Sequence, residues 1–179
     1  MIRAAFFALV LIALPAAAAD FCTLPDAKPL PDQLAGQWQG LMRGGILVGA
    51  DGKPQALPAD EVPQSLVFKA DGQNLTLVGD GFFPAVALAP APGTKDFALP
   101  GESPLEPAEL LQQEVGRLGL TCDPANLPRF FAQIPMDAGA VSRFDIFAVA
   151  QDDMVLVVQG AGQGQAARAV FDLHRAPKP

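Results

Sequence analysis

The side chains that enzymes most often use for acid–base, nucleophilic and metal chemistry are scarce in this sequence. It has one histidine, His174, two cysteines and no tyrosine. A zinc site needs three or four histidine, cysteine or carboxylate ligands close together, whereas Cys22 and Cys122 are far apart in the chain. We therefore expect no metal site and no cofactor, and we predict that the protein is not an enzyme.

The remaining candidates for chemistry have simpler explanations. No serine lies in a Gly-x-Ser-x-Gly sequence, and His174 would be the only base available to activate one. Asp152 and Asp153 are neighbouring carboxylates, but adjacent residues of a turn point apart, so turn formation explains them better. His174 falls on the outward face of the last predicted strand, where a solvent-exposed histidine is expected.

The N-terminal residues have the pattern of a removable export signal. A basic start that ends at Arg3 precedes an apolar run, Ala4–Leu14, and a series of alanines follows and ends at Ala19. We predict cleavage near Ala19, which leaves a periplasmic or secreted protein and makes residues 1–19 the signal peptide. The apolar run is shorter than the roughly 20 residues that a membrane-spanning helix needs, so no membrane span is expected.

Cys22 and Cys122 are an even pair of cysteines in a chain that we expect to be exported. In an oxidising compartment such a pair is typical of a structural disulfide, with free thiols as the alternative. The bond would tether an N-terminal arm, residues 20–33, which three prolines should keep extended. The arm precedes a single domain that covers residues 34–176.

Charge and composition exclude other classes of protein. The chain of 179 residues has a formal net charge of −7, so it lacks the basic face that a nucleic acid would require. Half of the residues are apolar and only 17% are charged, which is too hydrophobic for a disordered protein. The 18 prolines and 17 glycines indicate a folded domain that is rich in loops.

Apolar and polar residues alternate in short runs, which predicts β-strands. In the first run Trp38, Met42, Ile46 and Val48 share one face. Residues 51–63 and 160–165 should form loops, and the second should be mobile and exposed because it consists of Gly, Ala and Gln. The predicted strands cover residues 36–48, 65–69, 74–78, 82–88, 130–134, 143–150, 154–158 and 167–175.

One segment has helical spacing instead. Leu110, Leu111, Val115 and Leu118 fall at helical spacing, acidic residues lie near the start, and Gly119 suits the end. We therefore expect one helix near residues 105–118 in a protein that is otherwise mainly β.

About eight antiparallel strands without β–α–β alternation predict a closed or nearly closed barrel. Closure would also hide the edges of an apolar sheet. Gly36 and Trp38 form a Gly-x-Trp sequence that resembles the opening of the lipocalin and wider calycin group of small barrels. The resemblance implies that Trp38 closes one end of the barrel and that Arg175, on the last strand, packs across it.

Two functions from different classes fit such a barrel, and a purely structural envelope component, with neither ligand nor stable partner, is a third possibility. The first, which we favour, is binding of a small apolar ligand, since an eight-stranded barrel is wide enough to hold one. The alternative is an inhibitor or interaction module that acts on a secreted or envelope enzyme. The chain also resembles bacterial inhibitors of secreted metalloproteases, in which an N-terminal arm enters the enzyme's cleft. The side chains that would line a ligand cavity, unless they simply fill the interior, are Met42, Phe68, Leu77, Phe82, Phe144 and Met154.

Overall fold

Strands dominate the part of the chain that the structure describes. The computed structural model describes residues 21, 30–78, 83–91 and 126–177. A short 3-10 helix, Asp137–Gly139, lies between two of the strands. The other elements, in chain order, are α1 (Leu30–Leu34), β1 (Gly36–Val48), β2 (Pro54–Leu57), β3 (Gln64–Asp71), β4 (Asn74–Val78), β5 (Val86–Ala91), β6 (Arg129–Pro135), β7 (Val141–Ala150), β8 (Asp153–Gly162) and β9 (Gln165–Arg175).

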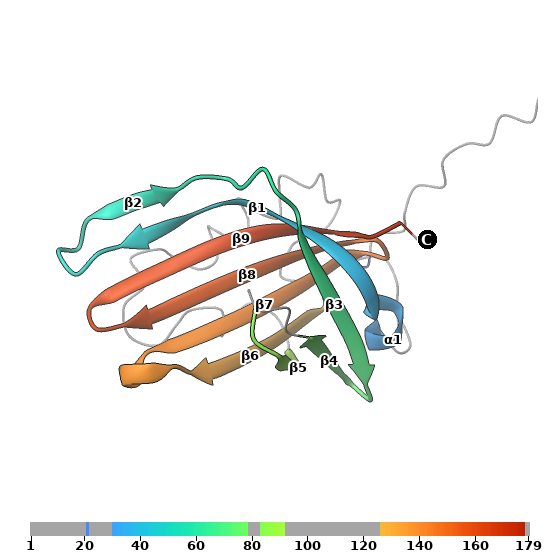
Figure 1. Ribbon diagram of the computed structural model, residues 1–179. Helices are drawn as coiled ribbons and strands as arrows, with labels where there is room; N and C mark the ends of the chain where they lie inside the picture. The colour runs from blue at the N-terminus through green and yellow to red at the C-terminus, as the bar shows by residue number, and fades with distance from the viewer. Residues whose placement is uncertain (1–20, 22–29, 79–82, 92–125, 178–179) are drawn as a thin grey trace, which may run out of the picture.

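The strands form one antiparallel sheet that closes on itself (Figure 1). The order β1, β3, β4, β5, β6, β7, β8, β9 returns to β1, because β9 pairs with β1 along most of its length. The first half of β1 pairs with β3 on its other edge, and the second half pairs with the additional strand β2. The predicted antiparallel barrel of about eight strands is therefore confirmed.

Some of the predicted features cannot be compared with the structure. The signal segment 1–19, the helix near 105–118, both cysteines and Phe82 lie outside the described residues. The strand predicted at 82–88 corresponds to β5, which begins later, at Val86.

A β-bulge in β1 changes which side chains face the interior. The register with β9 shifts after Met42. Beyond the bulge, Leu47 lies opposite the inward-facing Ala167, and residues directly opposite each other in antiparallel strands project to the same face. The prediction that Ile46 and Val48 share the face of the tryptophan is therefore wrong, because the extra residue of the bulge reverses the alternation.

Two segments predicted as loops contain strand. Within 51–63, β2 forms because its residues pair with β1. Within 160–165, β8 continues to Gly162 and β9 begins at Gln165, so only Gln163 and Gly164 make the turn. Both turn residues have positive φ, 53° and 74°, which matches the tight turn that favours the twist of a hairpin. The small side chains hid the strand pattern in the sequence, and pairing on both sides of β8 supplies the stability instead.

The end of the N-terminal arm is helical rather than extended, at least from residue 30. Pro31 suits the first turn of a helix, where its missing N–H is not needed, and Asp32 favours the same end. The N–H of Ala35 donates to the carbonyl of Pro31 at 2.9 Å. Leu34 is fully buried, so the short helix α1 is held by packing against the barrel.

The barrel interior differs between its two ends. At the end that carries α1, β3, β4 and β5 (right in Figure 1), the interior is a continuous cluster of buried apolar side chains. At the other end, β1, β2, β8, β9 and the β6–β7 connection extend beyond the shorter strands. Met42, Ile134, Val158 and Ala169 lie there and are only partly buried against the core.

Candidate functional site

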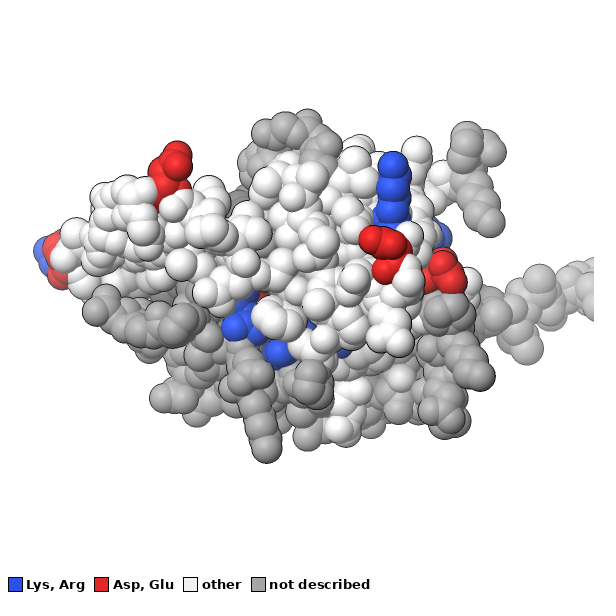
Figure 2. Space-filling model, turned by 90° about the horizontal axis from the view of Figure 1, so that it is seen from below, with Lys and Arg blue, Asp and Glu red and all other residues white. Residues whose placement is uncertain are grey.

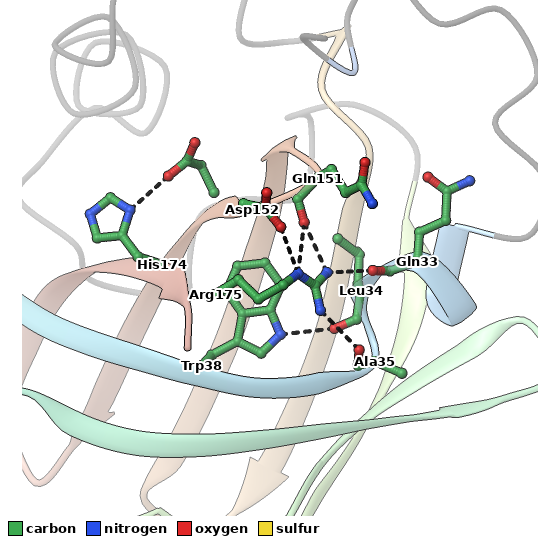
Figure 3. Close-up of polar contacts among 9 residues, drawn as sticks. Gln33, Leu34, Ala35, Trp38, Gln151, Asp152, His174 and Arg175 are labelled. Atoms are coloured by element: carbon green, nitrogen blue, oxygen red, sulfur yellow. Dashed lines mark hydrogen bonds and ion pairs between the residues drawn. The ribbon is translucent and has the colours of Figure 1, made fainter. Parts of the chain in front are cut away.

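Trp38 and Arg175 meet at the closed end of the barrel (Figure 3). They are opposite each other in the β1–β9 register, and the Arg175 guanidinium lies 4.5 Å from the centre of the indole ring. Trp38 is 1% exposed, and its Nε1–H donates to the carbonyl of Leu34 at 2.9 Å. The indole therefore seals the interior while the cation covers it from outside.

The guanidinium of Arg175 also joins three segments of the chain. It donates to the carbonyl of Gln33 and, at 3.1 Å, to that of Ala35, both at α1. On the β7–β8 turn it donates to the carbonyl of Gln151 at 2.8 Å and to the carboxylate of Asp152 at 2.7 Å. One side chain thus fixes α1 and the turn against β1 (Figure 3).

Gly36, the glycine of the Gly-x-Trp sequence, has two structural reasons to be glycine. Its φ is 135°, a conformation that other residues rarely adopt. A Cβ at this position would lie 3.1 Å from Nη1 of Arg175. The Gly-x-Trp sequence and the last-strand arginine therefore form one local arrangement.

A polar groove of about 760 Å³ lies beside this closure. In it Nδ1 of His174 lies 2.6 Å from Oδ1 of Asp153, and these two residues are opposite each other in the β8–β9 register. Asp152 turns the other way, to Arg175, so the two adjacent carboxylates do point apart as expected. The groove is lined by Asp32, Gln33, Ala35, Gln151, Asp152, Asp153, His174, Arg175, Ala176 and Pro177.

The His174–Asp153 pair has limited scope for catalysis. A carboxylate that holds Nδ1 can orient an imidazole for proton transfer, but among the described residues no hydroxyl or thiol side chain lines this groove. The imidazole is 64% exposed in its side chain, so water surrounds it. The sequence pattern gave no sign of the pairing, which becomes visible only when the register of the final hairpin is known.

Four of the six predicted lining residues are part of the packed core. These side chains are between 0 and 3% exposed, and all four belong to one hydrophobic cluster: Phe68, Leu77, Phe144 and Met154. The wall of a ligand cavity would keep accessible area, so these four side chains fill the interior in this structure. Met42 is half-buried and lies farther along the barrel.

The opposite end of the barrel presents a half-buried apolar inner surface, which we call the mouth. Two rows of residues cross the inner face of β1, β9, β8, β7 and β6 here. The outer row consists of Leu47, Ala167, Gly160, Ser142 and Ile134, and the inner row, one step toward the core, of Gly45, Ala169, Val158, Phe144 and Ala132. Every member of the outer row is half-buried, whereas Phe144 and Ala132 of the inner row are buried.

The edge of β2 beside the mouth is poorly suited to pairing with another strand. The N–H of Gly49 donates to the carbonyl of Lys53, so the backbone groups of Lys53 and of alternate residues after it face β1. Pro54 and Ala56 therefore face away from β1, and proline has no N–H. Within β2, Ala56 is therefore the only residue whose backbone N–H points away from β1.

The free edge of β6 has the same character. β6 pairs with β5 only through Arg129–Phe131. Met136 donates to the carbonyl of Ala140, so alternate residues before Met136 face β7, and Gln133 and Pro135 face the free edge. A proline on each edge discourages strand addition at both sides of the mouth.

A buried charged cluster lies on the outer face of the barrel. Arg143 donates to both oxygens of Asp145, at 2.8 and 3.2 Å, and Nε of Arg129 lies 3.7 Å from the same carboxylate. Both guanidinium groups also lie over the ring of Phe131. Burial raises the pKa of Asp145, although the nearby guanidinium groups act in the opposite direction. The cluster is almost inaccessible to solvent, so it joins strands rather than presenting a binding surface.

Comparison with known proteins identifies no relative. No family model, no curated protein and no solved structure matches the chain. Among the described residues, no group of three or more histidine, cysteine or acidic side chains could hold a metal ion. None of the described helices is long and apolar enough to cross a membrane. The antiparallel barrel is consistent with a calycin-like architecture.

Proposed function

We propose that this protein is a non-catalytic, exported barrel that binds a small apolar ligand at the mouth. The observation that carries the proposal is the difference between the two ends of the interior. The end at Trp38 is sealed, whereas the outer row at the mouth contains apolar side chains that are only partly buried. Burying such a surface against an apolar ligand is favourable by about 25 cal/mol for each Å² removed from water. Export to the periplasm or beyond is proposed from the N-terminal sequence.

An inhibitor that inserts its N-terminal arm is less well supported. The N–H of Phe21 donates to the carbonyl of Val149 at 2.9 Å, and its ring belongs to the core. If the signal is cleaved near Ala19, Phe21 would be the second residue, and little free arm would precede it. The prolines on the edges of β2 and β6 also oppose capture of a partner by strand addition.

The experiment is to purify the mature protein from its host under native conditions and to measure its mass intact, then after denaturation. An additional mass that is released on denaturation and extracts into organic solvent is expected. Ala167→Phe should fill the mouth and reduce the occupancy at least tenfold. Ala166→Phe places the same ring one residue away on the opposite face of β9, and it should leave the occupancy unchanged.

Two outcomes would reject the proposed ligand binding at the mouth. A protein that carries no additional mass and fails to enhance the fluorescence of an uncharged apolar dye would not be a carrier. Equal binding by the Ala167→Phe and Ala166→Phe variants would place any ligand elsewhere than in the mouth.

A further inference from the structure

The mouth has no charged side chain in either of its rows. The outer row contains one polar group, the hydroxyl of Ser142, and all other members of both rows are apolar or glycine. Opposite Leu47, the neighbouring strand β2 adds the uncharged amide of Gln55 to the same face. A carboxylate or phosphate that entered these rows would lose water without gaining a cation. The inner surface therefore accepts only the uncharged part of a ligand.

The turns that border the mouth provide no excess of positive charge. On the β1–β2 turn, Nζ of Lys53 lies 3.5 Å from the carboxylate of Asp51. The β8–β9 turn presents Gln163 and Gly164, and the connection between β6 and β7 contains Asp137. In the view from below, basic and acidic atoms meet at the left end of the molecule, and most of the described surface is uncharged (Figure 2).

The arginines nearest to the mouth are committed to other groups. Arg43 forms an ion pair with Asp172, and Nη2 of Arg168 donates to the side chain of Gln159 at 3.0 Å. Arg168 lies next to inward-facing residues of β9 and so projects to the outer face.

We infer that the ligand of the mouth is an uncharged apolar molecule, such as a long-chain alcohol or ester, and not a fatty acid anion. This inference rests on the proposed ligand binding at the mouth. The occupant is defined by charge complementarity. The rows of the mouth carry no cation, the described turns around them carry no net positive charge, and the net charge of −7 on the chain repels anions.

The test compares two ligands that differ only in the head group. Dodecanol and dodecanoate are titrated against the mature protein at pH 8 and low salt, with displacement of an uncharged fluorescent probe as the readout. Dodecanol is expected to bind at least tenfold more tightly. Equal affinities, or tighter binding of dodecanoate, would overturn the inference and leave the proposed function standing, whereas binding of neither ligand nor probe would reject both.

A charge variant makes the test specific to the rim. Gln165→Lys adds a cation at the start of β9, on the same side of the strand as Ala167. It should improve dodecanoate binding several-fold and leave dodecanol binding unchanged. Gln37→Lys adds the same charge at the closed end, where the exposed Gln37 lies next to Trp38. It should change neither affinity, and an equal gain in both variants would mean that net charge, rather than the rim, sets the preference.

Discussion

Replacing Arg175 by methionine should destabilise the protein by removing the closure of one barrel end. The guanidinium lies 4.5 Å from the indole centre, and such a contact contributes about 1 kcal/mol. Its part-buried bonds to the carbonyls of Gln33 and Ala35 contribute about 1 kcal/mol each. The ion pair with Asp152 is exposed on one side and adds little. The expected loss in the free energy of unfolding is about 3 kcal/mol.

The assay is equilibrium unfolding in urea, followed by tryptophan fluorescence. Trp38 is the single tryptophan, so the signal reports directly on the closed end. A loss of about 3 kcal/mol corresponds to a melting temperature lower by about 6–12 °C in a domain of this size. The emission should also shift to longer wavelength, because the indole gains contact with water when the guanidinium is removed.

Two further variants define the contribution of the guanidinium. Arg175→Lys keeps the charge but cannot reach both carbonyls of α1 with a planar fork, so it should lose about 2 kcal/mol. His174→Gln removes the exposed contact between His174 and Asp153, one residue away, and should stay within about 0.5 kcal/mol of wild type. If Arg175→Met stays within about 1 kcal/mol of wild type, the reasoning that the arginine secures the barrel end is refuted.

Three other substitutions give separate tests. Gly36→Ala should cost about 1–3 kcal/mol in urea unfolding, because alanine is strained at a φ of 135°, and a neutral effect would contradict this geometry. Gly45→Ala should exceed the usual range of about 0.5–3 kcal/mol and weaken amide protection in β9, since its Cβ would lie 2.1 Å from the carbonyl oxygen of Arg168. Burial raises the pKa of Asp145 above its usual value, so the folded state binds a proton on this carboxylate more readily than the unfolded state does. The free energy of unfolding of the wild type should therefore rise relative to that of Asp145→Asn as the pH falls through the folded-state pKa. A relative loss over the same pH range would show that the guanidinium groups outweigh burial.

The closed end could be predicted from the sequence because its parts obey local rules. The alternation of β9 places Arg175 on the same face as Phe171 and Leu173, and both are buried in the core. Trp38 lies on the alternating part of β1 that precedes the bulge, so the face of the sheet on which it lies could also be predicted. These positions depend only on strand periodicity, which a single sequence carries.

The mouth could not be predicted in the same way. The bulge in β1 reversed the alternation, so Leu47 replaces Ile46 on the inner face. Gly44 lies at this shift with a φ of 138°, but Gly40 and Gly45 occur in the same strand, so the glycines alone do not locate the bulge. The pairing of β8 with β9 beyond Gly160 depends on neighbouring strands rather than on side-chain pattern. Predicted lining residues such as Phe68 and Leu77 belong to the buried core rather than to the mouth, because periodicity gives the face of a residue and not its depth along the barrel.

The two ends of the barrel follow from the unequal lengths of its strands. β4 and β5 have five and six residues, whereas β1 and β9 have 13 and 11, so the short strands can line only part of the wall that the long ones define. Large side chains fill the part where all eight strands run together. Beyond it, the long strands carry small residues such as Gly160 and Ala167 on their inner face. Bulky side chains at these two positions would expose more apolar surface in the absence of a ligand, so the small residues limit the apolar area that an unoccupied mouth presents to water.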